Sequence, residues 1–276
     1  MNLVIQGPSL NALQAQEAAL LARTPAIETL AEHAFRLRNA SFDAAIPAWC
    51  EARRIDHAFM PEGRRFAGLK LLAMDMDSTL ITIECIDELG DMAGRKAEVA
   101  QITAQAMRGE IDYPESLRRR VALLAGLPRA ALERVYEERL RLTPGAEALL
   151  AACRREGVRV LLVSGGFTFF VERLKERLGI DYAISNVLEI DGERLTGRLR
   201  GRIVDAEAKA ARFRAVAQEL GAAKGETVAI GDGANDLKMM AQAGVSVAYR
   251  AKPVVRSQAT CALSWTGLDG VLNLFE

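Results

Sequence analysis

The chain has 276 residues, half of them hydrophobic and about a quarter charged, so it can bury a substantial core and is not disordered. Its 36 basic and 36 acidic side chains cancel, which argues against a broad basic surface for nucleic acid or anionic lipid. The two histidines, His33 and His57, both lie early in the chain. A site beyond them must therefore use carboxylates, Ser, Thr, Lys or Arg.

The N-terminal residues and the cysteines favour a cytoplasmic protein. Residues 1–8 contain neither the basic nor the apolar stretch of a secretory signal, and no window approaches the ~18 uninterrupted apolar residues of a membrane span. The cysteines are far apart and form no CxxC pair; they are Cys50, Cys85, Cys153 and Cys261. We therefore expect reduced thiols and neither a membrane nor a nucleic-acid partner.

Residues 1–66 are predicted to form a small separate α/β module. The expected elements are a strand at 2–6, a helix from Pro8 to 21, a strand at 33–38 and a helix at 45–55. Residues 61–65, Pro-Glu-Gly-Arg-Arg, are typical of a linker. The module carries both histidines but no recognisable chemistry.

Residues 67–276 are predicted to form an α/β core, because short apolar runs alternate there with helical patterns. The predicted strands are residues 71–74, 158–163, 227–230 and 245–248. The predicted helices are residues 144–155, 170–178, 205–220 and 236–243. A hairpin is expected around Asp191-Gly192. This pattern indicates a Rossmann-like, doubly wound parallel sheet.

One long segment interrupts the alternation. Between the first two predicted strands, residues of about 85–142 are nearly all helical in pattern, which is far more than one crossover connection needs. We therefore predict an inserted helical cap over the carboxyl edge of the sheet.

Polar residues follow three of the predicted strands. The first runs into Asp75-Met76-Asp77-Ser78-Thr79, the second into Ser164-Gly165-Gly166, and the third into Gly231-Asp232-Gly233-Ala234-Asn235-Asp236. The carboxyl ends of parallel strands share one edge of the sheet, so four carboxylates are expected to converge there. Such a cluster is costly unless a cation holds it. Because only oxygen ligands are on offer, the expected cation is Mg²⁺.

In type and order, these motifs resemble those of the haloacid dehalogenase superfamily of phosphohydrolases. The similarity covers roughly residues 70–250 and comprises a DxDx[TV] motif at 75–79, Ser164 at a strand end, Lys209 and the acidic loop 231–236. On this basis Asp75 is the predicted nucleophile, which forms an aspartyl-phosphate. Asp77 is the predicted acid for the leaving alkoxide and then the base for the attacking water.

The remaining polar residues of these motifs are expected to hold the metal and the phosphate. Asp75, the Asp77 backbone carbonyl and Asp232 would bind Mg²⁺, and Asp236 would either bind it directly or support those ligands. Lys209 would neutralise charge on Asp75 and on the phosphoryl group. The other expected substrate or phosphate contacts are Ser164, the Gly165 N–H, Thr79 and Asn235.

Within this superfamily the cap sequence resembles the phosphoserine phosphatases. Residues 83–89, Ile-Glu-Cys-Ile-Asp-Glu-Leu, and 113–121, Tyr-Pro-Glu-Ser-Leu-Arg-Arg-Arg-Val, carry the resemblance. It implies that Glu84 binds a substrate ammonium group and Arg120 a substrate carboxylate. Helical spacing also places Arg120 beside an apolar stripe, where an unpaired guanidinium would be costly. Tyr113 stands where that family carries Phe, so its hydroxyl could alter how the cap closes.

The resemblance implies Mg²⁺-dependent hydrolysis of O-phospho-L-serine to L-serine and phosphate, the last step of L-serine biosynthesis. Two alternatives stay open: a related phosphatase or phosphotransferase for another small phosphorylated metabolite, and a non-catalytic phosphate-binding regulator. Arg120 could instead form a salt bridge within the cap. For residues 1–66 the resemblance suggests a regulatory or dimerisation module, with a homodimer possible. A chain that starts near residue 66 is expected to keep hydrolytic activity.

Overall fold

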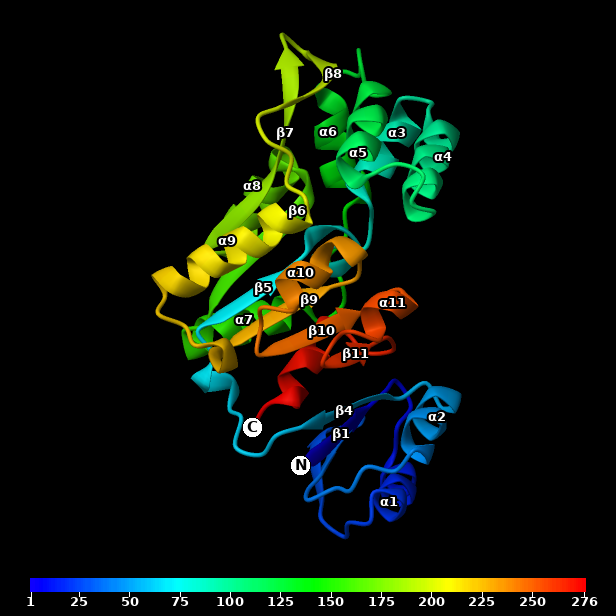
Figure 1. Ribbon diagram of the computed structural model, residues 1–276, viewed down its shortest axis with the longest axis vertical. Helices are drawn as coiled ribbons and strands as arrows, with labels where there is room; N and C mark the ends of the chain where they lie inside the picture. The colour runs from blue at the N-terminus through cyan, green and yellow to red at the C-terminus, as the bar shows by residue number, and fades with distance from the viewer.

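The computed structural model describes residues 1–276 and contains two β-sheets. Figure 1 shows a helical cap at one end, the larger sheet in the middle and the smaller sheet, which is formed by the N-terminal residues, at the other end. The larger sheet confirms the predicted α/β class. None of the helices combines the length and the apolar character that a membrane crossing requires.

The larger sheet has seven strands in the order β11-β10-β9-β5-β6-β7-β8. Its strands are β5 (Leu71–Met74), β6 (Arg159–Phe167), β7 (Tyr182–Asp191), β8 (Arg194–Arg200), β9 (Thr227–Gly231), β10 (Val245–Tyr249) and β11 (Cys261–Leu263). All neighbours pair in parallel except β7 and β8, which form the predicted hairpin. β7 pairs with β6 up to Asn186 and with β8 from Val187 onward, so the strand changes partners at this point.

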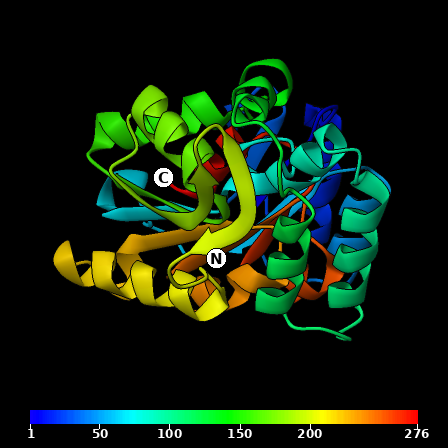
Figure 2. The same ribbon diagram turned by 90° about the horizontal axis from the view of Figure 1, so that it is seen from above.

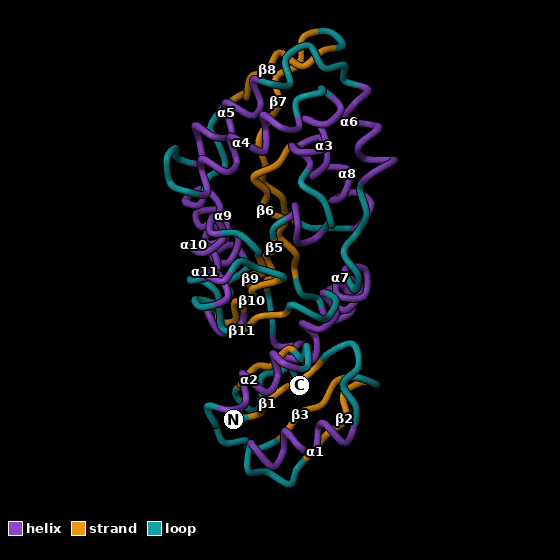
Figure 3. The backbone as a smooth tube through the Cα atoms, turned by 90° about the vertical axis from the view of Figure 1, so that its right-hand side faces the viewer, coloured by secondary structure: helices purple, strands orange, loops and turns teal.

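Alternate residues of the central strands pack against helices on opposite faces, as a buried parallel sheet requires. The helices of this layer structure are α7 (Ala146–Glu156), α8 (Thr168–Leu178), α9 (Ala206–Glu219), α10 (Leu237–Met240) and α11 (Pro253–Arg256). Leu72 and Met74 belong to the core that includes α7 and α8, whereas Leu71 and Ala73 pack in the core that includes α9, α10 and α11. Figure 3 shows the strands between these two groups of helices.

The cap lies between β5 and α7 in the chain. It contains α3 (Cys85–Met92), α4 (Lys96–Met107), α5 (Tyr113–Ala122), α6 (Ala130–Arg134) and a following helical turn at Val135–Arg139. Figure 2 looks down on these helices and on the β7–β8 hairpin beside them. The Gly126 N–H donates to the Leu195 carbonyl at 2.8 Å, which ties the cap to this hairpin. Gly197 lies there with φ +80°, where a Cβ atom would come within 2.8 Å of the Ala125 Cβ.

The N-terminal residues form an antiparallel sheet in the order β2-β3-β1-β4, covered by two helices. Its elements are β1 (Asn2–Gln6), α1 (Ala12–Leu21), β2 (Ile27–Ala31), β3 (Ala34–Leu37), α2 (Ala45–Ala52) and β4 (Asp56–Met60). The predicted start of the first helix at Pro8 is wrong, because Asn11 caps that helix by accepting from the Gln14 N–H at 3.0 Å. The strands β2, β4 and β11 were not predicted.

This small sheet is anchored to the C-terminal part of the core. The Asp56 carboxylate of β4 accepts hydrogen bonds from the backbone N–H groups of Ser264, Trp265 and Thr266, with shortest distances of 2.7 to 3.0 Å. Gln6 donates from Nε2 to the Gly270 carbonyl at 3.0 Å. Polar groups from opposite ends of the chain therefore satisfy one another at this junction.

Candidate active site

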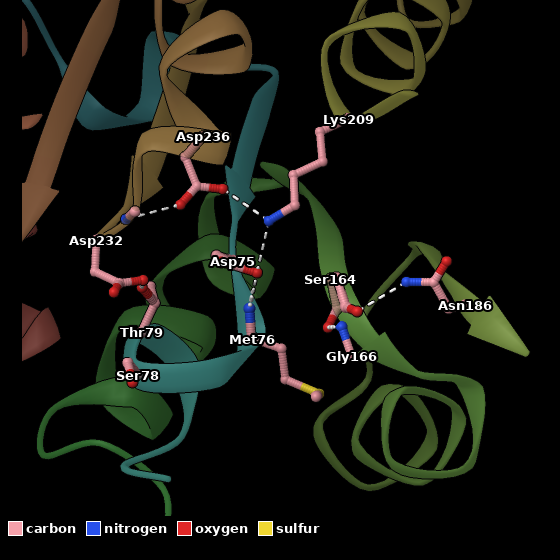
Figure 4. A network of polar contacts seen from close by, with 12 residues as sticks. Asp75, Met76, Ser78, Thr79, Ser164, Gly166, Asn186, Lys209, Asp232 and Asp236 are labelled. Carbon is pink, nitrogen blue, oxygen red and sulfur yellow. Dashed lines mark hydrogen bonds and ion pairs between the residues drawn. The ribbon is translucent and has the colours of Figure 1, made fainter. Parts of the chain in front are cut away.

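Asp75 lies at the carboxyl end of the central strand. The four residues of β5 are fully buried and apolar, and the chain leaves the sheet directly after them. Asp75 is itself buried, and its Oδ1 accepts from the Met76 N–H at 2.7 Å. The same oxygen lies 3.0 Å from Nζ of Lys209, on α9 (Figure 4).

Lys209 joins two of the predicted site residues. Its fully buried ammonium group also donates to Oδ1 of Asp236 at 2.8 Å. Burial disfavours the charged lysine, but the two carboxylates outweigh burial and raise its pKa, so Lys209 stays protonated. Burial, reinforced by Asp236, raises the pKa of Asp75 well above its usual range.

The loop after β9 brings two further carboxylates, Asp232 and Asp236, next to Asp75. Oxygen atoms of Asp75, Asp232 and Asp236 all lie within 4.8 Å of one another. Asp232 is only partly buried and accepts from Oγ1 of Thr79 at 3.3 Å, and Asp236 Oδ2 accepts from the Gly233 N–H at 3.1 Å. Burial and the neighbouring Asp236 raise the pKa of Asp232 to about 7. This cluster has the ligands and the unbalanced negative charge of a divalent cation site.

Asp77 and Glu84 lie where the cap leaves the core. The Asp77 Oδ1 accepts from the Cys85 N–H at 2.9 Å, and a Cβ atom on Gly166 would come within 2.5 Å of Asp77 Oδ2. The carboxyl group is therefore held between the start of the cap and the carboxyl end of β6. Burial, followed by the effect of Glu84, raises the pKa of Asp77 to about 7. Glu84 accepts from Oγ of Ser78 at 2.6 Å.

Ser164 lies near the carboxyl end of β6, beside Gly166, which approaches the Asp77 carboxyl group. Its buried Oγ accepts from the Gly166 N–H at 2.8 Å. Asn186 of β7 was missed by the sequence reasoning, although it is buried and donates to the Gly165 carbonyl at 2.8 Å (Figure 4). A polar Asn within a strand, with no turn sequence around it, was the available signal.

In the cap, Arg120 is only 9% exposed, as its helical position indicates, whereas Arg118 and Arg119 lie at the surface and pair with Glu115. The one hydrogen bond of the Arg120 guanidinium is a long contact of 3.4 Å from Nε to the Ser116 carbonyl. Burial raises the pKa of Glu84, and the positive charge of Arg120 partly opposes this increase. No cap carboxylate forms a salt bridge with Arg120, so its anion-binding capacity is unused.

Asn235 takes no part in the contacts that join the other predicted residues. Its side-chain oxygen folds back over its own loop, where a Cβ atom on Gly233 would lie 2.3 Å from Oδ1. Among the other predicted residues, Lys209 joins Asp75 and Asp236, and Thr79 joins Asp232. Arg120 makes no hydrogen bond or ion pair to any of them.

Known proteins resemble this chain in both sequence and architecture. The sequence profile of the haloacid dehalogenase-like hydrolases matches residues 72–241. A phosphoserine phosphatase from Polaromonas sp. is 56% identical over 217 residues, which cover 77% of this chain and 92% of that protein. One from Albidiferax ferrireducens is 52% identical over the same shares of the two chains.

Solved structures that resemble this chain include phosphoserine phosphatases too. The unliganded crystal structure of a probable phosphoserine phosphatase from Vibrio cholerae has a TM-score of 0.86 and 37% identity, with 99% of this chain and 85% of that one covered. A substrate-bound phosphoserine phosphatase complex has a TM-score of 0.71 and 38% identity, with 75% of this chain and 99% of that one covered. The resemblance seen in the motifs is thus confirmed. The chain belongs to the haloacid dehalogenase-like hydrolase family.

Proposed function

We propose that this protein is a Mg²⁺-dependent phosphoserine phosphatase that hydrolyses O-phospho-L-serine to L-serine and phosphate. The observation that carries this proposal is the position of Asp75, whose Oδ1 lies at the tip of the central strand, 3.0 Å from the ammonium group of Lys209. The relatives named phosphoserine phosphatase, at up to 56% identity, support the choice of substrate.

The acidic cluster fits a hard divalent cation. Asp75, Asp232 and Asp236 offer oxygen ligands within 4.8 Å of one another, and Lys209 supplies the only ion pairs that these carboxylates make. We assign Asp75 and Asp232 as ligands of Mg²⁺, with the Asp77 backbone carbonyl. Asp236 already accepts from Lys209 and Gly233 and is assigned to hold the cluster in place. When bound, Mg²⁺ would neutralise charge between the phosphate and the carboxylates.

In the first half of the reaction, an oxygen of Asp75 attacks phosphorus and the bond from phosphorus to the seryl oxygen breaks. Asp77 donates its proton to the departing alkoxide, which leaves as the L-serine hydroxyl. Its pKa, raised to about 7 by burial and then by Glu84, leaves a large fraction of Asp77 protonated near neutral pH. The charge of Lys209 offsets the negative charge on Asp75 and on the phosphoryl group.

In the second half, Asp77 is a carboxylate and takes a proton from water. That water attacks phosphorus, the bond from phosphorus to Asp75 breaks, and phosphate leaves with Asp75 restored as a carboxylate. The cap covers this site, and it can exclude other water while the aspartyl-phosphate exists.

Substrate selection is assigned to the cap. Arg120 is a buried cation without an anionic partner, which suits the carboxylate of the substrate. Glu84 would take the ammonium group, although in the structure its Oε1 already accepts from Ser78. Ser164, the Gly165 N–H, Thr79 and Asn235 are assigned to oxygens of the phosphate or the substrate.

The test is a comparison of kcat/KM among small phosphate esters. O-Phospho-L-serine should be the best of a panel that also contains phosphothreonine, phosphohomoserine and sugar phosphates, and EDTA should abolish turnover. Preference for a sugar phosphate would instead point to another phosphatase of this family. Binding of phosphate without any turnover would point to a regulator.

We also propose that residues 1–66 are a regulatory or dimerisation module and that residues 67–276, with a cap of about 85–142, carry the catalysis. The substrate-bound phosphoserine phosphatase is 99% covered by only 75% of this chain, which supports an accessory role for part of it. A chain starting at residue 66 should keep kcat/KM. If the full chain forms a homodimer, the truncated chain should be a monomer. Loss of turnover in a truncated chain that stays folded would contradict the division.

A further inference from the structure

The carbonyl of Gly165 receives hydrogen bonds from two parts of the molecule. Asn186, on core strand β7, donates from Nδ2 at 2.8 Å, and its own Oδ1 accepts from the Val204 N–H at 2.8 Å. Tyr113, the first residue of cap helix α5, donates from its hydroxyl at 3.2 Å. One carbonyl therefore joins the cap to the core sheet beside the candidate phosphate site.

The same peptide group reaches Ser164. A peptide unit is planar, so the direction of the Gly165 carbonyl fixes the direction of the Gly166 N–H. This N–H donates to Ser164 Oγ at 2.8 Å, as Figure 4 shows. Because that oxygen accepts a hydrogen bond from the chain, the Ser164 hydroxyl proton is left to donate to a ligand.

The fit between Tyr113 and Gly165 of β6 is close. A Cβ atom on Gly165 would come within 2.2 Å of the Tyr113 hydroxyl oxygen but only within 3.3 Å of the ring carbon that carries it. The phenol is held with its hydroxyl against Gly165. Burial raises the pKa of Tyr113 to about 12, so the hydroxyl keeps its proton for donation.

We propose that Tyr113 is a positioning residue through which the cap completes the phosphate site at the carboxyl end of β6, residues 164–166. Its hydroxyl holds the Gly165–Gly166 peptide in the orientation that directs Ser164 toward a phosphate oxygen. This inference rests on the proposed function, which assigns Ser164 to the phosphate. A phenylalanine would keep the ring packing and lose this link.

The first test replaces Tyr113 by Phe and measures both catalysis and phosphate binding. Loss of one neutral hydrogen bond should raise KM for O-phospho-L-serine, and Kd for inorganic phosphate by calorimetry, about three- to tenfold each. The value of kcat should stay within about twofold, because the contact is present in both ground and transition states. The control is Glu133→Gln, which weakens another cap–core contact, the 2.7 Å ion pair to Arg173.

Glu133→Gln should leave phosphate Kd unchanged. If Glu133→Gln raised the phosphate Kd as much as Tyr113→Phe does, Tyr113 would be only one of several contacts that hold the cap on the core, and the proposal would fail. An unchanged Kd in Tyr113→Phe, or no phosphate binding by the wild-type protein, would also overturn it. Phosphate binding needs no turnover, so a wild-type protein that binds phosphate but ignores O-phospho-L-serine would reject the proposed substrate alone.

A double-mutant cycle tests the geometry itself. Gly165→Ala should weaken phosphate binding strongly when Tyr113 is present, because the new methyl group meets the hydroxyl oxygen. In the Tyr113→Phe background the same change should cost several-fold less, since the nearest remaining ring atom is 3.3 Å away. Effects that simply multiply would show that the two groups do not touch, and this result would contradict the proposal.

Discussion

Replacement of Lys209 by Met is the sharpest probe of the buried charges. Lys209 is fully buried, and it pairs with Asp75 at 3.0 Å and Asp236 at 2.8 Å. At an effective dielectric constant of 20, each attraction is worth about 5–6 kcal/mol before the cost of burying the lysine. Met fills a similar volume, so the change removes the charge and leaves two buried carboxylates without their cation.

Breaking a buried ion pair from one side costs about 3–5 kcal/mol, because the remaining charge stays buried. In a chain of this size that loss lowers the unfolding midpoint by roughly 6–20 °C. The matched control is Lys238→Met, which breaks an exposed 3.0 Å pair with Glu207. The control should cost less than about 1 kcal/mol.

Thermal and urea unfolding of both variants, in EDTA and then with saturating Mg²⁺, provide the assay. We expect Lys209→Met to lose stability in EDTA and to gain more from Mg²⁺ than the wild type does, because the ion supplies part of the missing charge. Turnover should fall sharply in that variant and stay normal in the control. If the two variants are equally stable in EDTA, the buried ion pairs of Lys209 do not stabilise the fold.

Replacement of Arg120 or Asp56 and removal of the metal test three other parts of the structure. Arg120→Ala should raise KM for O-phospho-L-serine at least tenfold, whereas Arg119→Ala, at an exposed position of the same helix, should not; equal effects in steady-state kinetics would remove Arg120 from the substrate site. EDTA should abolish phosphate release, and Mg²⁺ should restore it; turnover that survives complete chelation would contradict the metal assignment. Asp56→Asn should lower the free energy of unfolding by about 2 kcal/mol in urea and leave kcat unchanged, because an amide cannot accept all three backbone N–H groups. The control is Asp191→Asn at an exposed position. An equal loss of stability in the control would disprove the anchoring role of Asp56.

The core was predictable because its strands carry a strong local signal. β5 is apolar throughout and β9 is apolar from Val228 to Ile230, both strands are fully buried, and Asp75 and Asp232 follow them directly. The parallel topology then places those residues at one edge without any further information. This explains why Asp75, Asp232 and Asp236 come together as expected.

The strands that were missed lack such a signal. β2 alternates exposed and half-buried residues at the edge of its sheet. β4 begins with Asp56, a poor strand residue. Asp56 can be buried because backbone N–H groups donate to its carboxylate, and these donors lie 208 to 210 residues further along the chain. A local pattern cannot contain that information.

Some site contacts were hidden for the same reason. Asn186 is a single polar residue of β7, and its importance comes from Gly165 and Val204 on two other segments. Tyr113 could be placed in the cap from the sequence, but the target of its hydroxyl depends on how the cap packs on β6. Residue chemistry predicted which groups are available, and the packing decided which of them meet.

Detection of the phosphorylated enzyme is the most direct test of the central claim that Asp75 accepts the phosphoryl group. Wild-type protein and Asp75→Asn would be mixed with O-phospho-L-serine and Mg²⁺, quenched in acid within the first turnover, digested and examined by mass spectrometry. We expect one added phosphoryl group on Asp75 in the wild-type protein and no adduct or phosphate release in the variant. A phosphoryl group on another residue, or undiminished phosphate release by Asp75→Asn, would contradict it.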